Sequence, residues 1–128
     1  MDRLMLSLQV ARKALTSLQE LLVIAHPSTI ERDASIQRFE YTFEAVWKAA
    51  KHYLRENEGL DLASPKSIVR SCREVGLINV AQATKALEMT DDRNLTSHTY
   101  NETLAVKIHS RLPEYAQVMN SWLISMEK

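Results

Sequence analysis

The stretch IQRFEYTFEAVWKAAKHYL occupies residues 36–54, and its apolar side chains recur at steps of three and four residues. They are Ile36, Phe39, Phe43, Val46 with Trp47, Ala50 and Leu54. This spacing places one apolar stripe along a helix. The polar side carries Asp33, Gln37, Glu40, Glu44, Lys48 and Lys51. The stretch therefore predicts a long amphipathic helix with one buried face.

Start and stop signals bound this helix on both sides. Ser28 stands three residues before Glu31, which is capping-box spacing, and Gly59 suits the left-handed position that ends a helix. The preceding segment has its own apolar stripe, and we expect that long first helix to end at His26-Pro27. Its apolar positions are Leu4, Leu8, Ala11, Leu15, Leu18 and Leu22.

Two short helices are predicted next. Ser64-Pro65 combines a capping serine with a proline at the first helical position, and Gly76 ends this third helix. Asn79 begins a fourth helix, whose C-terminal end includes residues 91–97. The apolar positions of both helices are Ile68, Val69, Cys72, Val75, Val80, Ala83 and Leu87.

The last predicted helix is long. It begins between Thr99 and Asn101, because Thr99 and Glu102 have capping-box spacing, and Pro113 predicts a kink inside it. Its apolar positions are Leu104, Ile108, Leu112, Tyr115, Val118 and Trp122.

Glycine and proline are scarce in the chain, with two and three residues respectively. A β-rich chain of this length would need many more turn residues. The predicted helices are joined by short connections, which favour antiparallel neighbours. We therefore expect an all-α fold with a single domain over residues 1–128. The expected architecture is an up-down helical bundle of four to five helices, two long, two short and one long and kinked.

The net charge and the cysteine content indicate which partners and which cellular compartment the protein is expected to have. Lys plus Arg and Asp plus Glu number 16 each, and the resulting net charge of zero argues against a large nucleic-acid surface. A small local site remains compatible with it, but DNA binding is not expected. Cys72 is the one cysteine, which fits a reducing compartment. Without a signal-peptide pattern or a membrane-length apolar run, we expect a cytoplasmic protein that does not enter membranes.

The sequence RNLTSHTY, residues 93–100, concentrates groups that can handle a phosphate and a proton. Arg93 is a permanent planar cation, position 98 carries histidine, the residue type whose unperturbed pKa lies nearest neutrality, and Tyr100 adds a phenol. Neutral donors between them are Asn94, Thr96 and Ser97. On one continuous helix, Arg93 and His98 would lie about 140° apart. Joint action therefore requires a helix end or bend between them, or a second subunit.

Residues 93–100 contain the kinds of side chain that cleavage of RNA without a metal requires. A base takes the proton of the ribose 2′-OH, an acid protonates the leaving oxygen, and cations hold the charged phosphorane. His98 suits the base or the acid, and Arg93 suits the cation. One chain supplies a single such histidine, whereas a homodimer would supply two histidines and two arginines in one cleft. The chemistry therefore favours a homodimer. In the structural alternative, Arg93 forms a surface ion pair with Asp91 or Asp92, and His98 is a cap or a solvated side chain.

The octet of residues 93–100 resembles the signature of the HEPN superfamily. The wider chain is similar to the branch called nucleotidyltransferase substrate-binding proteins. Two further blocks match in the expected order, namely residues 38–48 and the pair formed by residues 64–66 and 76–78. The resemblance covers nearly all of the chain, and the blocks are specific only in combination.

This resemblance implies a dimerising helical bundle encoded beside a minimal nucleotidyltransferase, often as a toxin–antitoxin pair. It assigns ribonuclease catalysis to Arg93 and His98, with Asn94 assisting, and we add Ser97 as a second assisting candidate. It also makes Tyr100 the residue that the partner adenylylates. AMP on Tyr100 would place a bulky anion beside the phosphate site.

Side chains outside the octet are weaker candidates. Glu40 and Glu44 either pair with Arg93 and line the cleft or belong to a solvated face. The aromatic residues of the 36–54 stretch are a base-stacking platform or core, and their helical spacing favours core. No metal or cofactor is expected, because His26, His52 and His109 lack ligand-spaced partners.

Three functions stay open at this point. The chain is a metal-independent endoribonuclease silenced by its partner, a non-catalytic subunit that presents nucleotide or RNA to that partner, or a dimeric scaffold. It is not itself the transferase, because it lacks a Gly-Ser pair followed by Asp-x-Asp.

Overall fold

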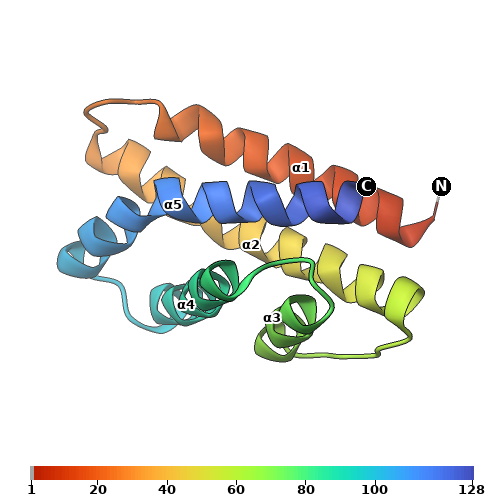
Figure 1. Cartoon of the computed structure of the whole chain (residues 1–128). Coiled ribbons are helices and arrows are strands. Elements are labelled where there is room, and N and C mark those ends of the chain that lie inside the picture. The colour runs from red at the N-terminus through yellow and green to blue at the C-terminus, as the bar shows by residue number, and fades with distance from the viewer. Residues whose placement is uncertain (1) are drawn as a thin grey trace.

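The computed structural model describes residues 2–128, and the regular secondary structure in that range is entirely helical. Figure 1 shows α1, α2 and α5 running along the length of the molecule, with α3 and α4 packed on one side of them. The helices are α1 (Arg3–Leu22), α2 (Thr29–Glu58), α3 (Pro65–Glu74), α4 (Val80–His98) and α5 (Glu102–Glu127). The predicted all-α helical bundle is confirmed.

Most helix ends follow the predicted signals. Ser28 and Glu31 form a capping box, and Gly59 ends α2 with a φ of 68°, in the left-handed region that favours glycine. Ser64 and Asn79 cap α3 and α4 with their side-chain oxygens. These ends were predictable because each depends on residues within one turn of one another.

The first helix ends earlier than expected. α1 stops at Leu22, with Val23 as its C-cap, and does not continue to His26-Pro27. Val23 is 82% exposed, so a further turn of helix would bury little apolar surface against the core. Without that packing, the turn before the proline does not join the helix.

The fourth and fifth helices also differ from the prediction. α4 has 19 residues and is not short. Thr99 is its C-cap, and the Thr99 N–H donates to the Leu95 carbonyl at 2.8 Å. The N-cap of α5 is therefore Asn101, whose side chain accepts from the Leu104 N–H at 2.8 Å. The start of α5 falls within the predicted range of Thr99 to Asn101, but the capping residue is Asn101, because Thr99 caps the end of α4.

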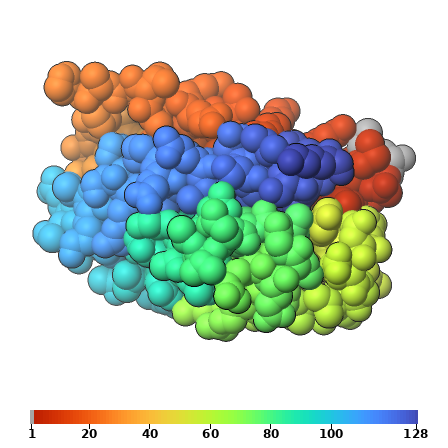
Figure 2. Space-filling model, in the orientation of Figure 1, coloured from red at the N-terminus to blue at the C-terminus, as the bar shows by residue number. Residues whose placement is uncertain are grey.

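The core runs between the helices, and α1 to α5 all contribute buried side chains to it. Phe39 and Phe43 on α2 are fully buried, and Phe39 stacks on Tyr115 of α5 with a ring-centroid distance of 5.4 Å. Helical spacing correctly favoured core packing for these rings. Figure 2 shows α5 lying between the surface of α1 and that of α3 and α4. Pro113 lies within α5, whose axis changes direction in Figure 1, in line with the expected kink.

Candidate functional site

A buried carboxylate anchors the C-terminal half of α4. Asp92 is 2% exposed, and it accepts hydrogen bonds from Arg111 at 2.7 and 2.9 Å and from Tyr115 at 2.5 Å. Both donors lie on α5. Burial and the bond to Asp92 raise the pKa of Tyr115, so its phenol remains a donor. This network fixes α4 against α5 at the position directly before Arg93.

Arg93 extends from α4 to α2. Its Nη2 atom lies 3.4 Å from Oε2 of Glu44, and the indole of Trp47 donates to the same oxygen at 3.0 Å. Arg93 thus forms the ion pair with Glu44 that the sequence left open. The indole orients the carboxylate, and the carboxylate in turn orients the guanidinium.

The other acids near Arg93 in the sequence have different partners. Asp91 pairs with Lys66 of α3 at 2.9 Å, and Asp92 is bound by α5. The proposed surface pair between Arg93 and Asp91 or Asp92 is therefore not the observed one. Consecutive residues of a helix point about 100° apart, so Asp91, Asp92 and Arg93 face three different neighbours.

A second carboxylate lies close to Arg93. Glu40 stands one turn before Glu44 on α2, and burial raises the pKa of its carboxyl. The charge of Arg93 and a hydrogen bond with Thr96 oppose that rise. The Nε atom of Arg93 is buried and has no hydrogen-bond partner among the described residues. Arg93 is therefore held by α2 with part of its donor capacity unused.

His98 is the last residue of α4 and is exposed. The helix is continuous from Arg93 to His98, so the two side chains leave it about 140° apart. Because Arg93 faces α2, His98 projects from a different side of α4. The helix ends after His98 and not between the two residues. One copy of the chain therefore does not bring this cation and this imidazole together.

The two assisting candidates differ in their surroundings. Asn94 is exposed at the surface of α4. The hydroxyl of Ser97 donates to the backbone carbonyl of Arg93 at 3.1 Å, so its proton is used within the helix. Asn94 is therefore the better placed of the two to donate to a ligand.

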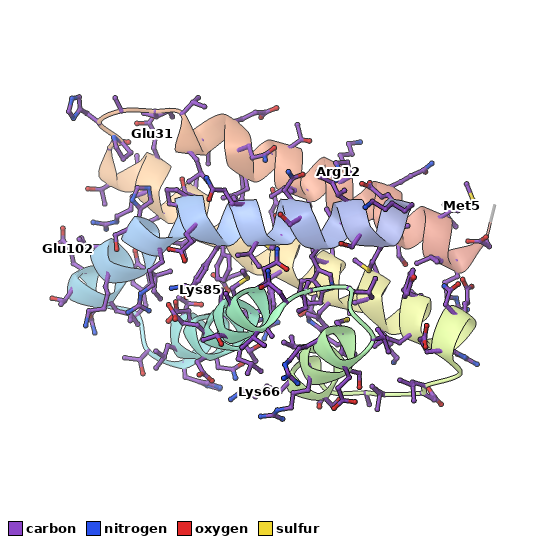
Figure 3. The ribbon with its side chains drawn as sticks, in the orientation of Figure 1. Met5, Arg12, Glu31, Lys66, Lys85 and Glu102 are labelled. Atoms are coloured by element: carbon purple, nitrogen blue, oxygen red, sulfur yellow. The ribbon has the colours of Figure 1, made fainter. Side chains whose placement is uncertain are left out.

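Tyr100 lies beyond the end of α4 and bridges to the start of α2. Its hydroxyl donates to Oδ1 of Asp33 and is within hydrogen-bonding reach of Arg32. The bond to Asp33 raises the pKa of Tyr100. Arg32 also pairs with Asp33 at 3.2 Å and with Glu102 at 3.4 Å. Figure 3 shows Glu31 and Glu102 at the same end of the molecule, where α2 and α5 begin.

Sequence reasoning missed the pairing of Arg32 and Asp33 with Tyr100. Asp33 appeared only as a member of the polar side of a helix, and Arg32 was not singled out. The contact joins residues 67 positions apart, so no local spacing could indicate it. The only available signal was the position of both residues in the first two turns of a helix.

Other candidate residues do not extend the site. Within residues 2–128, no group of three or more His, Cys, Asp and Glu side chains is arranged to hold a metal ion. Cys72 is buried, and its burial raises the pKa of the thiol to about 12. None of the helices described for residues 2–128 is long and apolar enough to cross a membrane.

The family follows from comparison with known proteins. The chain matches the family described as nucleotidyltransferase substrate binding protein like over residues 6–128, and it belongs to that family. The resemblance to this branch of the HEPN superfamily is thereby confirmed. A relative from Haemophilus influenzae, the probable ribonuclease HepT, is 28% identical over 85 residues. The match covers 63% of this chain and 57% of that relative, little more than half of its length.

Two solved structures share the fold. A protein from Thermus thermophilus is 57% identical with a TM-score of 0.89, and the match covers 92% of this chain and 99% of that one. A tri-AMPylated HEPN toxin from Shewanella oneidensis, in complex with an MNT antitoxin, gives a TM-score of 0.81 at 15% identity. That match covers 99% of this chain and 98% of the toxin, and it establishes a common fold alone.

Proposed function

We propose that this chain is the HEPN-type partner of a minimal nucleotidyltransferase in a toxin–antitoxin-like pair, and that it is a metal-independent endoribonuclease. The observation that carries the proposal is the arrangement of the α4 end. There a guanidinium is held by Glu44, and an imidazole is exposed without a role in the core. His98 moves the protons of the reaction, Arg93 stabilises the phosphorane, and Asn94 and Ser97 assist.

The same arrangement favours a homodimer. Arg93 and His98 leave α4 on different sides, so a single copy lacks a complete site. A two-fold axis beside the α4 ends would place two histidines and two arginines in one cleft. One histidine could then act as base while the other acts as acid. Analytical ultracentrifugation tests this assembly, and a monomer at micromolar concentration, alone and with the partner, would contradict the shared cleft.

Silencing by the partner is the second part of the proposal. The nucleotidyltransferase transfers AMP to Tyr100, which is 54% exposed. The tri-AMPylated state of the Shewanella toxin supports a modification of this kind. AMP at this position would place a bulky anion next to the end of α4. The added charge and volume would exclude the RNA phosphate from the site.

The proposal is tested by cleavage of RNA in excess EDTA with purified protein. His98→Ala should abolish cleavage, and Arg93→Ala should lower it by about 10²–10³-fold, as expected for loss of a transition-state donor. His26→Ala and Arg55→Ala are matched controls at exposed positions away from α4, and they should cleave normally. Tyr100→Phe should retain most cleavage yet escape silencing, because it has no hydroxyl to accept AMP.

The family description favours one alternative function. A nucleotidyltransferase substrate binding protein need not be catalytic, and this chain would then be the nucleotide- or substrate-binding subunit of a two-component transferase. The same assay separates the two functions. A wild-type dimer that binds nucleotide, leaves a range of RNAs intact and is required for transfer by its partner would establish the alternative.

A further inference from the structure

The surroundings of Tyr100 contain the groups that its modification requires. Attack of a phenol on the α-phosphorus of ATP needs an acceptor for the phenolic proton and a cation beside the phosphate. The Tyr100 hydroxyl already donates to the carboxylate of Asp33. The guanidinium of Arg32 lies against both side chains, with its Nε atom 3.2 Å from Asp33.

We propose that Asp33 is the base that accepts the Tyr100 proton during adenylylation, and that Arg32 binds the reacting phosphate. This inference rests on the proposed transfer of AMP from ATP, with the nucleotide supplied by the partner nucleotidyltransferase. The helical chain then contributes a base and a phosphate-binding cation to the transfer reaction, in addition to the tyrosine that is modified.

The step balances with these groups. The Tyr100 oxygen forms a bond to the α-phosphorus of ATP, and the bond from that phosphorus to the bridging oxygen of pyrophosphate breaks. Pyrophosphate leaves with the electron pair of the broken bond. The phenolic proton moves along the existing hydrogen bond to Oδ1 of Asp33, and solvent later removes it. The product is a phosphodiester between Tyr100 and AMP.

A base is needed because the phenol holds its proton firmly. The bond to Asp33 raises the pKa of Tyr100 above its ordinary value of 10.0, so very little phenolate exists at neutral pH. A carboxylate that is already hydrogen-bonded to the hydroxyl can accept the proton as the new bond forms, so free phenolate is not required. The Asp33 side chain is 43% exposed, which leaves it accessible to a docked partner.

The side chain of Arg32 is less exposed than those of Asp33 and Tyr100. Its side chain is 12% exposed and lies between the carboxylates of Asp33 and Glu102. A guanidinium in this position offers its remaining N–H groups to phosphate oxygens with little loss of conformational freedom. After transfer, the same cation would neutralise the phosphodiester of Tyr100-bound AMP.

The experiment measures single-turnover AMP incorporation at Tyr100 with purified partner and Mg-ATP, followed by intact mass and peptide mapping. Asp33→Asn should slow incorporation by about 10²–10⁴-fold, the usual contribution of a general base, and Asp33→Glu should recover part of the rate. Arg32→Gln should also slow it. Asp61→Asn is the matched control, because it makes the same chemical change at an exposed carboxylate that pairs with neither Tyr100 nor Arg32. It should change the rate by no more than a few-fold.

A pH profile separates a base from a residue that only positions the hydroxyl. The deficit of Asp33→Asn should shrink as pH rises toward ionisation of the phenol, because phenolate needs no base. Arg32, Glu102 and His109 also face this cluster. Hydrogen bonds with Tyr100 and Asp33 outweigh burial and raise the pKa of Arg32, and burial followed by the charge of Arg32 lowers the pKa of His109. Both shifts move these pKa values away from the range in which the phenol ionises.

Two results would overturn the role of Asp33. They are a wild-type rate in Asp33→Asn, or a deficit that is the same at every pH. Absence of AMP on Tyr100 in the wild-type protein would overturn the modification and the base together. RNA cleavage by the unmodified wild-type preparation is measured in parallel, so that a failure of the nuclease proposal is a separate result.

Discussion

Replacing Asp92 with alanine should destabilise the protein far more than replacing its neighbour Arg93. Asp92 is 2% exposed and accepts three hydrogen bonds from α5. Removing one member of a buried ion pair costs about 3–5 kcal/mol, because the other charge is left unpaired. The Arg111 side chain is 34% exposed, so water can solvate it in the variant. The expected loss is therefore near the lower end, about 3 kcal/mol.

Variants of the two residues next to Asp92 should lose much less stability. Arg93 pairs with Glu44 through side chains that are 37% and 31% exposed, and such pairs contribute about 0–1 kcal/mol. Arg93→Ala should therefore change the free energy of unfolding by no more than about 1 kcal/mol. Asp91→Ala is the matched acidic control, because Asp91 is 61% exposed in its pair with Lys66. It should also lose less than about 1 kcal/mol.

Urea unfolding followed by far-UV circular dichroism measures all three variants at one fixed protein concentration. The urea concentration at the unfolding midpoint should differ between the variants. The slope of the unfolding free energy against urea concentration should stay the same, since all variants expose the same surface on unfolding. The melting temperature of Asp92→Ala should fall by roughly 10–15 °C for a chain of this size. Equal losses in Asp92→Ala and Arg93→Ala would refute the reasoning, because Arg93 would then be a structural residue. A loss below about 1 kcal/mol in Asp92→Ala would show that the buried network contributes no net stability.

Phe43→Ala should cost about 3–5 kcal/mol in the same urea experiment, because the ring is fully buried, whereas the exposed His98→Ala should unfold at the wild-type midpoint. Cys72 should react with a thiol reagent only at the rate of unfolding, since burial raises its pKa to about 12; fast labelling of the folded protein would contradict this. Burial raises the pKa of Glu40 above 4.5 in the folded protein. Below pH 4.5 the carboxyl is protonated in both the folded and the unfolded protein, and stability is lost as pH rises through the raised pKa, because the folded protein then holds a buried charge. Glu40→Gln should therefore melt higher than wild type at pH 7 and equally below pH 4.5, and the opposite order would exclude burial as the dominant cause.

The positions of the helices could be predicted from sequence because their causes are local. The apolar stripe of residues 36–54 reports which face of that helix is buried, whatever packs against it. The capping box of Ser28 and Glu31 and the left-handed Gly59 each involve a single turn of chain. Predictions were wrong where the outcome depended on packing. α1 ends before His26, because the extra turn has no core to cover.

The candidate site was predictable in its residue types but not in its contacts. The motif of residues 93–100 named Arg93, His98 and Tyr100, and the 36–54 stretch offered Glu44 as a partner. The sequence could not show that Asp92 is buried, because it lies in a polar run that resembles a solvated surface. It also could not show that Tyr100 meets Asp33, since 67 positions separate them.

The sequence by itself determined which segments are helices, which face of each is apolar and which residues can carry phosphate chemistry. Those properties depend on side chains three or four residues apart. The tertiary structure alone decided that Arg111 and Tyr115 surround Asp92, that Glu44 holds Arg93, and that Arg32 and Asp33 meet Tyr100. Each of these contacts joins two helices or a helix and a connection. Their pairing is set by how the whole core packs, and no local periodicity encodes it.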